Sequence, residues 1–213
     1  SLAHEASVSK TIKDVRESFS YIAVAISVAP LDCKYFDMST PTMMEKDCDI
    51  SGLKPKIITA SGSGIVVRHV INTTYVLTAA HVCSHPQVDT QMFGHKKISV
   101  KLTPNHRVRD VEGNWYESEI YALDARNDLC ILKSKGLFGT PIPLAKEMPD
   151  IPSPVYTYGA PLGISAPNMV LFYKGYTSGP FYDSQMERNL YYHTLVIRGG
   201  SSGSAVLNSR GEI

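Results

Sequence analysis

The sequence predicts an all-β protein of two β units, preceded by a short N-terminal helix. Short segments rich in β-branched and aromatic residues follow one another between turn residues over most of the chain. A stretch with five prolines at 135–154 divides these segments into two sets. We therefore expect a helical segment at 1–20, a first β unit at 21–134, a linker at 135–154 and a second β unit at 155–213.

The helical pattern is confined to residues 7–19. Val8, Ile12, Val15 and Phe19 recur at spacings of four, three and four residues, and charged residues occupy the other positions. This spacing places the apolar side chains on one face of a helix.

The first β unit is predicted to start at residue 21, where the pattern changes to alternating apolar residues. Residues 32–57 are polar and indicate a long loop. The predicted strands of this unit are 21–28, 64–68, 75–78, 97–103, 115–123 and 129–133. Those of the second unit are 155–158, 170–176, 191–197 and 205–208.

The charge balance argues against nucleic acid as the main partner. The 213-residue chain has 21 Lys and Arg against 20 Asp and Glu, a formal net charge of +1, whereas phosphate binding needs clustered cations. The most apolar stretch, 21–31, is about half of the ~20 residues that a membrane-spanning helix needs. Lys10, Asp14 and Arg16 interrupt any apolar signal core in residues 1–20, so we expect no signal peptide there. This does not settle the compartment, and the sequence leaves the oligomeric state open.

The four cysteines are too few for a disulfide scaffold at this length. Cys33 and Cys48 flank a polar segment, and whether they are bridged stays open, because sequence cannot establish pairing. Cys83 and Cys130 lie in apolar runs, where we expect small buried side chains.

A Gly/Ser-rich segment at 198–205 contains a candidate nucleophile, Ser202. A serine hydroxyl reacts only with a base to take its proton and with donors for the oxyanion that forms. Neighbouring glycines allow tight turns and close approach of a carbonyl to the main chain. We expect the oxyanion hole in the backbone of Gly200, Ser201 and Ser202, with the Gly200 and Ser202 N–H groups as donors. Taken alone, the segment could equally be an ordinary turn.

A candidate base, His81, follows an apolar strand and three small residues at 78–80. Histidine is the usual general base because its pKa lies near the working pH. A structural histidine is the simpler alternative. Metal binding by His81, Cys83 and His85 is disfavoured, since no fourth ligand is suggested nearby.

A candidate orienting acid, Asp128, opens the apolar strand at 129–133. Such an acid could hold the second nitrogen of His81 and stabilise the imidazolium. A turn aspartate without a catalytic role is the alternative, and Asp124 competes for the same role.

In the order His81, Asp128, Ser202, these segments resemble the trypsin-like serine protease family. Residues 78–81 are similar to its histidine motif, 127–132 to its aspartate strand and 200–204 to its nucleophile loop. The chain order matches the chymotrypsin arrangement rather than those of subtilisin or the α/β-hydrolases. Segments 61–67, 158–163, 174–179, 206–208 and 211–213 resemble HtrA (Deg)-type members. Ser204, in place of a second glycine, departs from trypsin.

The resemblance implies two antiparallel six-stranded barrels with the active site between them, acting on a polypeptide substrate without cofactor or metal. We expect the second barrel to be truncated at the C-terminal end. Thr194, Leu195, Ile197 and Arg198 should line one side of the specificity pocket. Leu195 or Ile197 would favour an aliphatic substrate residue and Arg198 an acidic one, whereas no acid is present to select Lys or Arg.

Two other functions remain open at this point. The chain could be a non-catalytic binding or assembly module on a protease scaffold, because fold does not imply function. It could also be a virus-encoded maturation or self-cleaving protease, which would change the biological role and not the chemistry.

Overall fold

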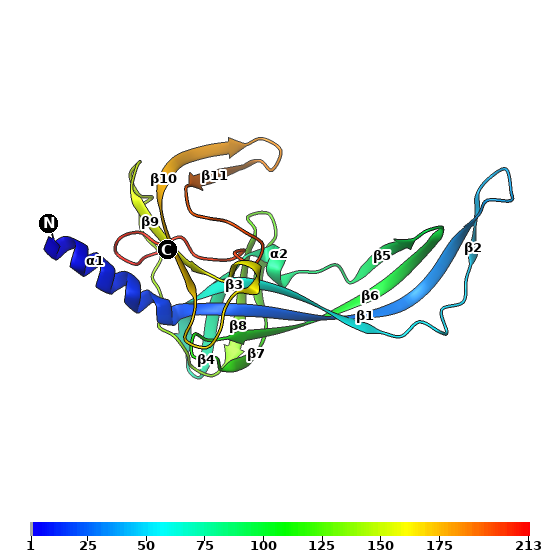
Figure 1. Cartoon of the computed structure of the whole chain (residues 1–213), viewed down its shortest axis with the longest axis horizontal. Helices are drawn as coiled ribbons and strands as arrows, with labels where there is room; N and C mark the ends of the chain where they lie inside the picture. Colours follow the sequence, from blue (N-terminus) through cyan, green and yellow to red (C-terminus); the bar gives the residue numbers. More distant parts are fainter. Residues whose placement is uncertain (1) are drawn as a thin grey trace. The chain divides into compact units, whose positions relative to one another are not determined.

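The structure is a computed structural model and describes residues 2–213. The described chain is mostly β, with one long helix at its start (Figure 1). It divides into two compact units. Unit 1 comprises residues 2–23, 61–83 and 106–213 of the described chain, and unit 2 comprises 24–60 and 84–105. Strands β1 (Phe19–Asp37), β3 (Lys56–Val70) and β6 (Lys96–Arg109) run through both units.

Helix α1 (Leu2–Val15) confirms the predicted N-terminal helix but starts and ends earlier than the pattern at 7–19. A short 3-10 helix, η1 (Arg16–Ser18), follows it and leads into β1. Ile12 and Val15 are buried in a core cluster that also contains Tyr156 and Leu207. The helix is therefore anchored by the apolar face that its spacing predicts.

The first β unit forms a closed antiparallel barrel. Its strand order is β1–β3–β4–β8–β7–β6, and an additional β1–β6 pairing closes it. Strands β4 (Thr73–Thr78) and β8 (Leu129–Lys135) alternate buried and more exposed residues, and β7 (Trp115–Asp124) pairs with β8. Val66, Val76, Val108 and Leu132 have no exposed surface and fill the interior. The predicted barrel is confirmed.

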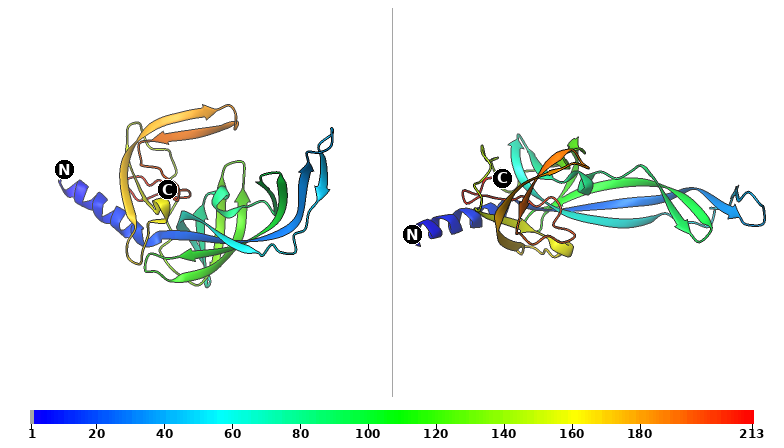
Figure 2. Two further views of the ribbon diagram at one scale, coloured as in Figure 1. Left: turned by 45° about the vertical axis from the view of Figure 1, so that its right-hand side comes forward. Right: turned by 90° about the horizontal axis from the view of Figure 1, so that it is seen from above.

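Unit 2 corrects the prediction of a long loop at 32–57. There β1 pairs with β2 (Met44–Asp47), and β5 (Val88–Phe93) pairs with β6 (Figure 2). Every residue of β2 is exposed, so its sequence lacks the alternation that reveals a half-buried strand. Cys33 and Cys48 form a disulfide beside this hairpin, and the Cys48 N–H donates to the Cys33 carbonyl at 2.9 Å.

The second β unit is a three-stranded antiparallel sheet in the order β11–β10–β9. It consists of β9 (Pro154–Gly159), β10 (Leu171–Asp183) and β11 (Arg188–His193), with a short helix η2 (Pro161–Gly163) after β9. Among the described residues it does not close into a second six-stranded barrel. Residues 194–213 form turns in which Gly200, Gly203 and Gly211 have positive φ, so the strand predicted at 205–208 is reduced to one bridge between Leu207 and Tyr156.

Candidate active site

His81 and Asp128 form a hydrogen-bonded pair. His81 lies in the one-turn helix α2 (Ala80–Cys83), and Asp128 precedes β8. His81 Nδ1 is 2.8 Å from Asp128 Oδ2 and 3.0 Å from Oδ1. The main-chain N–H of His81 also donates to Asp128 Oδ1 at 3.0 Å. Because the carboxylate accepts from Nδ1–H, Nε2 is the ring nitrogen left to take up a proton.

The backbone at Asp128 has a conformation that few residues adopt. Its φ is +57°, in the left-handed region that Asp and Asn tolerate best among residues with a side chain. Its carbonyl accepts the Ala80 N–H at 3.1 Å, so the start of α2 is attached to this turn. The main chain and the carboxylate of Asp128 thus both hold the segment that carries His81.

Asp124, the competing acid, is engaged elsewhere. Its carboxylate accepts the Asn127 main-chain N–H at 3.1 Å and the Asn127 amide Nδ2 at 2.7 Å. The Asn127 hydrogen bonds lower the pKa of Asp124. This aspartate stabilises the turn that presents Asp128 to His81.

Cys83 and Cys130 form a disulfide, a pairing that the sequence did not indicate. Both are buried, as expected, with 0% and 1% of their surface exposed. Cys83 lies two residues after His81 and Cys130 two residues after Asp128. Sequence could not reveal this pairing, because it depends on the approach of α2 to β8. It also removes the Cys83 thiolate from the metal-binding alternative.

The nucleophile loop packs on the segment before His81. The Ser63 N–H of β3 donates to the Ser202 carbonyl at 2.8 Å. A Cβ atom at Gly203, where φ is +84°, would overlap the Ser63 carbonyl oxygen and Thr78 Oγ1 and lie 3.0 Å from the Ala79 nitrogen. Only glycine allows this contact. It brings the Ser202 backbone beside the chain that leads to His81, although the described residues include no hydrogen bond from the Ser202 hydroxyl to His81.

The three candidate oxyanion residues differ in how their N–H groups are used. The Ser201 N–H donates to the Arg198 carbonyl at 2.9 Å and is part of the turn. The Gly200 and Ser202 N–H groups have no acceptor in the described part of the chain. Gly200 has a φ of +87°, and its carbonyl accepts the Ser63 hydroxyl at 3.0 Å. Two of the three N–H groups are therefore free to bind a developing oxyanion.

A pocket of about 190 Å³ adjoins Ser202. Leu195 and Ile197, both named from the sequence, line it. Thr194 does not: it bonds to the Tyr176 backbone through its N–H, at 3.0 Å, and through its hydroxyl, at 2.9 Å. Arg198 is also outside the lining. The remaining lining residues are Thr157, Gly159, Tyr173, His193, Val196, Ser201, Ser204 and Val206.

His193 contributes an imidazole to this pocket that the sequence did not indicate. Burial lowers its pKa, and its Nδ1 accepts the Leu195 N–H at 3.3 Å. Thr157 and Gly159 also line the pocket. Strand alternation could have shown that they share one face of β9. Nothing in the sequence places that face against residues 193–204.

Two further findings concern metals and membranes. Among the described residues, no group of three or more His, Cys, Asp or Glu side chains is arranged to hold a metal ion. None of the helices in residues 2–213 is long and apolar enough to cross a membrane.

Comparison with known proteins supplies a family. A family model, the trypsin-like peptidase domain, matches residues 62–213. The comparison with curated proteins found no match. The matched region is 152 of the 213 residues and includes His81, Asp128 and Ser202. The chain belongs to the trypsin-like peptidase domain family.

Proposed function

We propose that the chain is a serine endopeptidase with His81, Asp128 and Ser202 as its triad. His81 Nε2 takes the Ser202 proton as Oγ attacks the scissile carbonyl, and returns it to the leaving amine. The resulting acyl-enzyme is hydrolysed by water, which His81 activates in the same way. Asp128 keeps the proton on Nδ1 and stabilises the imidazolium, and the Gly200 and Ser202 N–H groups bind the oxyanion.

One observation supports this function most strongly: the carboxylate of Asp128 holds both the ring and the main chain of His81. A structural aspartate in a turn bonds within its own turn, as Asp124 does with the main chain and side chain of Asn127. The contact of Gly203 with Thr78 and Ala79 then brings the nucleophile loop to the same place.

The pocket beside Ser202 favours a modest aliphatic residue before the scissile bond. Leu195, Val196, Ile197 and Val206 contribute apolar surface, and no Asp or Glu lines the cavity. A Lys or Arg side chain would be desolvated there without a charge partner. Assignment to the HtrA-type branch, from segments 61–67 and 158–163, is part of the same proposal.

Hydrolysis of a peptide library tests the proposal. The chain should cleave after aliphatic residues. Ser202→Ala should reduce the rate of cleavage by several orders of magnitude. Ser201→Ala is the matched control, since it removes the neighbouring hydroxyl and keeps the main chain. Equal activity of the two variants would refute the assignment of Ser202.

The second candidate is a non-catalytic binding module. It is favoured by the absence of a Ser202–His81 hydrogen bond in the described chain. Catalytic hydrogen bonds are often long before substrate binds, so the peptidase remains the leading proposal. A folded chain that binds polypeptides but cleaves none would establish the second candidate.

A further inference from the structure

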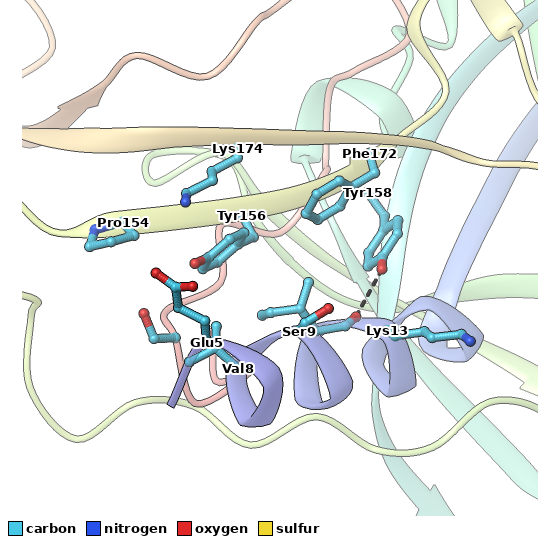
Figure 3. Close-up of a pocket in the computed structure, with 11 residues that line it drawn as sticks. Glu5, Val8, Ser9, Lys13, Pro154, Tyr156, Tyr158, Phe172 and Lys174 are labelled. Atoms are coloured by element: carbon cyan, nitrogen blue, oxygen red, sulfur yellow. Dashed lines mark hydrogen bonds between the residues drawn. The ribbon is translucent and has the colours of Figure 1, made fainter. Parts of the chain in front are cut away.

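A second cavity lies between α1 and the β9–β10 ribbon (Figure 3). Its volume is about 790 Å³, against about 190 Å³ for the pocket beside Ser202. Helix α1 contributes one wall and strands β9 and β10 the other. Its lining includes Glu5 and Lys13 of α1, Tyr156 and Tyr158 of β9, and Phe172 and Lys174 of β10.

This groove and the Ser202 pocket use opposite faces of the same two strands. Tyr156 and Tyr158 of β9 line the groove, whereas Thr157, between them, lines the pocket. Phe172 and Lys174 of β10 line the groove, and Tyr173 lines the pocket. Strand alternation produces this division, so a ligand in the groove would not occupy the candidate active site.

The aromatic wall of the groove is already assembled. The Phe172 ring lies 5.1 Å from the Tyr158 ring and 6.0 Å from the Tyr156 ring, measured between centroids. Tyr158 Oη donates to the Ile12 carbonyl at 2.9 Å, and Ile12 is buried in the core, so this bond ties the helix to the sheet. Phe172 nevertheless keeps 46% of its surface exposed. An exposed ring in a preformed groove is available for an apolar group.

Opposite charges meet at the Tyr156 end of the groove. Lys174 Nζ lies 5.8 Å from the centroid of the Tyr156 ring. Figure 3 shows the ends of Lys174 and Glu5 directed toward this ring, while Phe172 and Tyr158 lie further along the groove. Neither Lys174 nor Glu5 forms an ion pair with another described residue. The groove thus presents Lys174 and Glu5 at the Tyr156 end, and the Phe172 and Tyr158 rings with Lys13 at the other.

We propose that this groove binds a small zwitterion with an aromatic side chain, the class to which free aromatic amino acids belong. The ligand carboxylate pairs with Lys174 and its ammonium with Glu5, and its ring packs against Phe172 and Tyr158. The cavity volume lies within the ordinary range for small-molecule sites. This site is independent of the proposed peptidase activity.

Calorimetric titration with three probes tests the proposal on the intact chain. L-phenylalanine carries both charges, 3-phenylpropionate lacks the ammonium and phenethylamine lacks the carboxylate. L-phenylalanine should bind about three- to fivefold more tightly than either analogue, as expected for partly exposed charge pairs. Glu5→Gln should remove its advantage over 3-phenylpropionate, and Lys174→Gln its advantage over phenethylamine.

Lys10→Gln is the matched control, because Lys10 lies on the same helix outside the groove lining. It should leave all three affinities unchanged. Absence of saturable L-phenylalanine binding would overturn the proposal. Binding that neither Glu5→Gln nor Lys174→Gln alters would also overturn it, since the ligand would then occupy another site.

Discussion

Asp128 illustrates how much one residue can determine in this chain. Its carboxylate holds the His81 ring at 2.8 Å and its carbonyl accepts the Ala80 N–H, while its own backbone has a φ of +57°. Strained backbone of this kind persists where surrounding contacts over-determine it, often at functional sites. The hydrogen bonds that it makes with Ala80 and His81 are such contacts.

Asp128→Asn should lower kcat on a peptide substrate by about 10⁴-fold, because an amide favours the wrong imidazole tautomer. The fold should survive, since Asn also tolerates positive φ. Steady-state kinetics with a thermal unfolding curve measures both effects. Asp124→Asn is the control and should change kcat little; a larger loss from Asp124→Asn would exchange the roles of the two acids.

His193 makes stability depend on pH. Burial lowers its pKa in the folded chain, so the unfolded chain binds the proton more readily. Stability should therefore fall as the pH drops through the unfolded value of about 6.5, and His193→Gln should reduce this slope. Urea unfolding between pH 5 and 7.5 measures it. An unchanged slope in the variant would show that other groups cause the dependence.

The sequence indicates Ser202, His81 and Asp128 because each depends on local chemistry: glycines at a tight turn, small residues before a histidine, and an acid before a strand. The positions of His193 and Thr157 in the pocket could not be predicted in this way. Their place beside Ser202 depends on how β9, β10 and the loop after β11 pack together, and this is not encoded in any short segment.

At the scale of elements, the four-residue helix α2 is held at both ends. The Asp128 carbonyl accepts its first N–H, and at its other end the Cys83–Cys130 disulfide joins it to β8. His106 Nε2 also lies 2.7 Å from the Cys83 carbonyl. A single turn of helix has little stability of its own, so these ties position His81.

The double variant Cys83→Ala/Cys130→Ala should lose about 2–4 kcal/mol of unfolding free energy and should also lower kcat. Cys33→Ala/Cys48→Ala is the control, because that disulfide lies in unit 2 and joins cysteines at a sequence separation of 15. It should lose stability without a matching loss of kcat. Chemical unfolding measures the stability of both double variants, and steady-state kinetics measures their kcat. Equal kcat values would show that the Cys83–Cys130 disulfide does not position His81.

Strands β4 and β8 were predictable from the sequence, whereas β2 and β5 were not. β4 and β8 alternate in burial, and their segments stand out in the sequence. β2 and most of β5 are exposed, so pairing with a neighbour, and not periodicity, makes them strands. The same limit applies to the disulfide between Cys83 and Cys130, which needs the barrel to bring its ends together.

At the scale of unit 1 as a whole, Ser63 links the barrel to the segments that carry the candidate site. Its hydroxyl donates to the Gly200 carbonyl at 3.0 Å and accepts the Ala160 N–H at 3.0 Å. Its N–H donates to the Ser202 carbonyl at 2.8 Å. Ser63 and Ala160 are both completely buried, so the Ala160 N–H cannot bond to water instead.

Ser63→Ala should reduce the unfolding free energy by about 1–3 kcal/mol, because it leaves the buried Ala160 N–H unpaired and removes the donor to the Gly200 carbonyl. Chemical denaturation measures this loss. Ser20→Ala is the matched control: Ser20 is also buried, but its hydroxyl has no hydrogen-bond partner. If Ser20→Ala costs as much as Ser63→Ala, lost packing and not the hydrogen bonds explains the effect.

The overall class, all-β with a short helix, followed from turn spacing and strand composition. Among the described residues the second β unit consists of the three strands β9–β11, and residues 194–213 turn at glycines with positive φ and add one bridge at Leu207. A resemblance in short segments predicts the local turns well. It does not determine whether neighbouring strands close into a barrel.

The most direct measurement is covalent labelling with a fluorophosphonate, followed by peptide mapping of the labelled residue. A serine reacts with this reagent when a neighbouring base takes up its proton. The wild-type chain should be labelled at Ser202 alone, and His81→Ala should abolish the labelling while the chain stays folded. A folded wild-type chain that remains unlabelled at Ser202, or one in which His81→Ala is labelled equally well, would contradict the assignment of these residues to a catalytic triad.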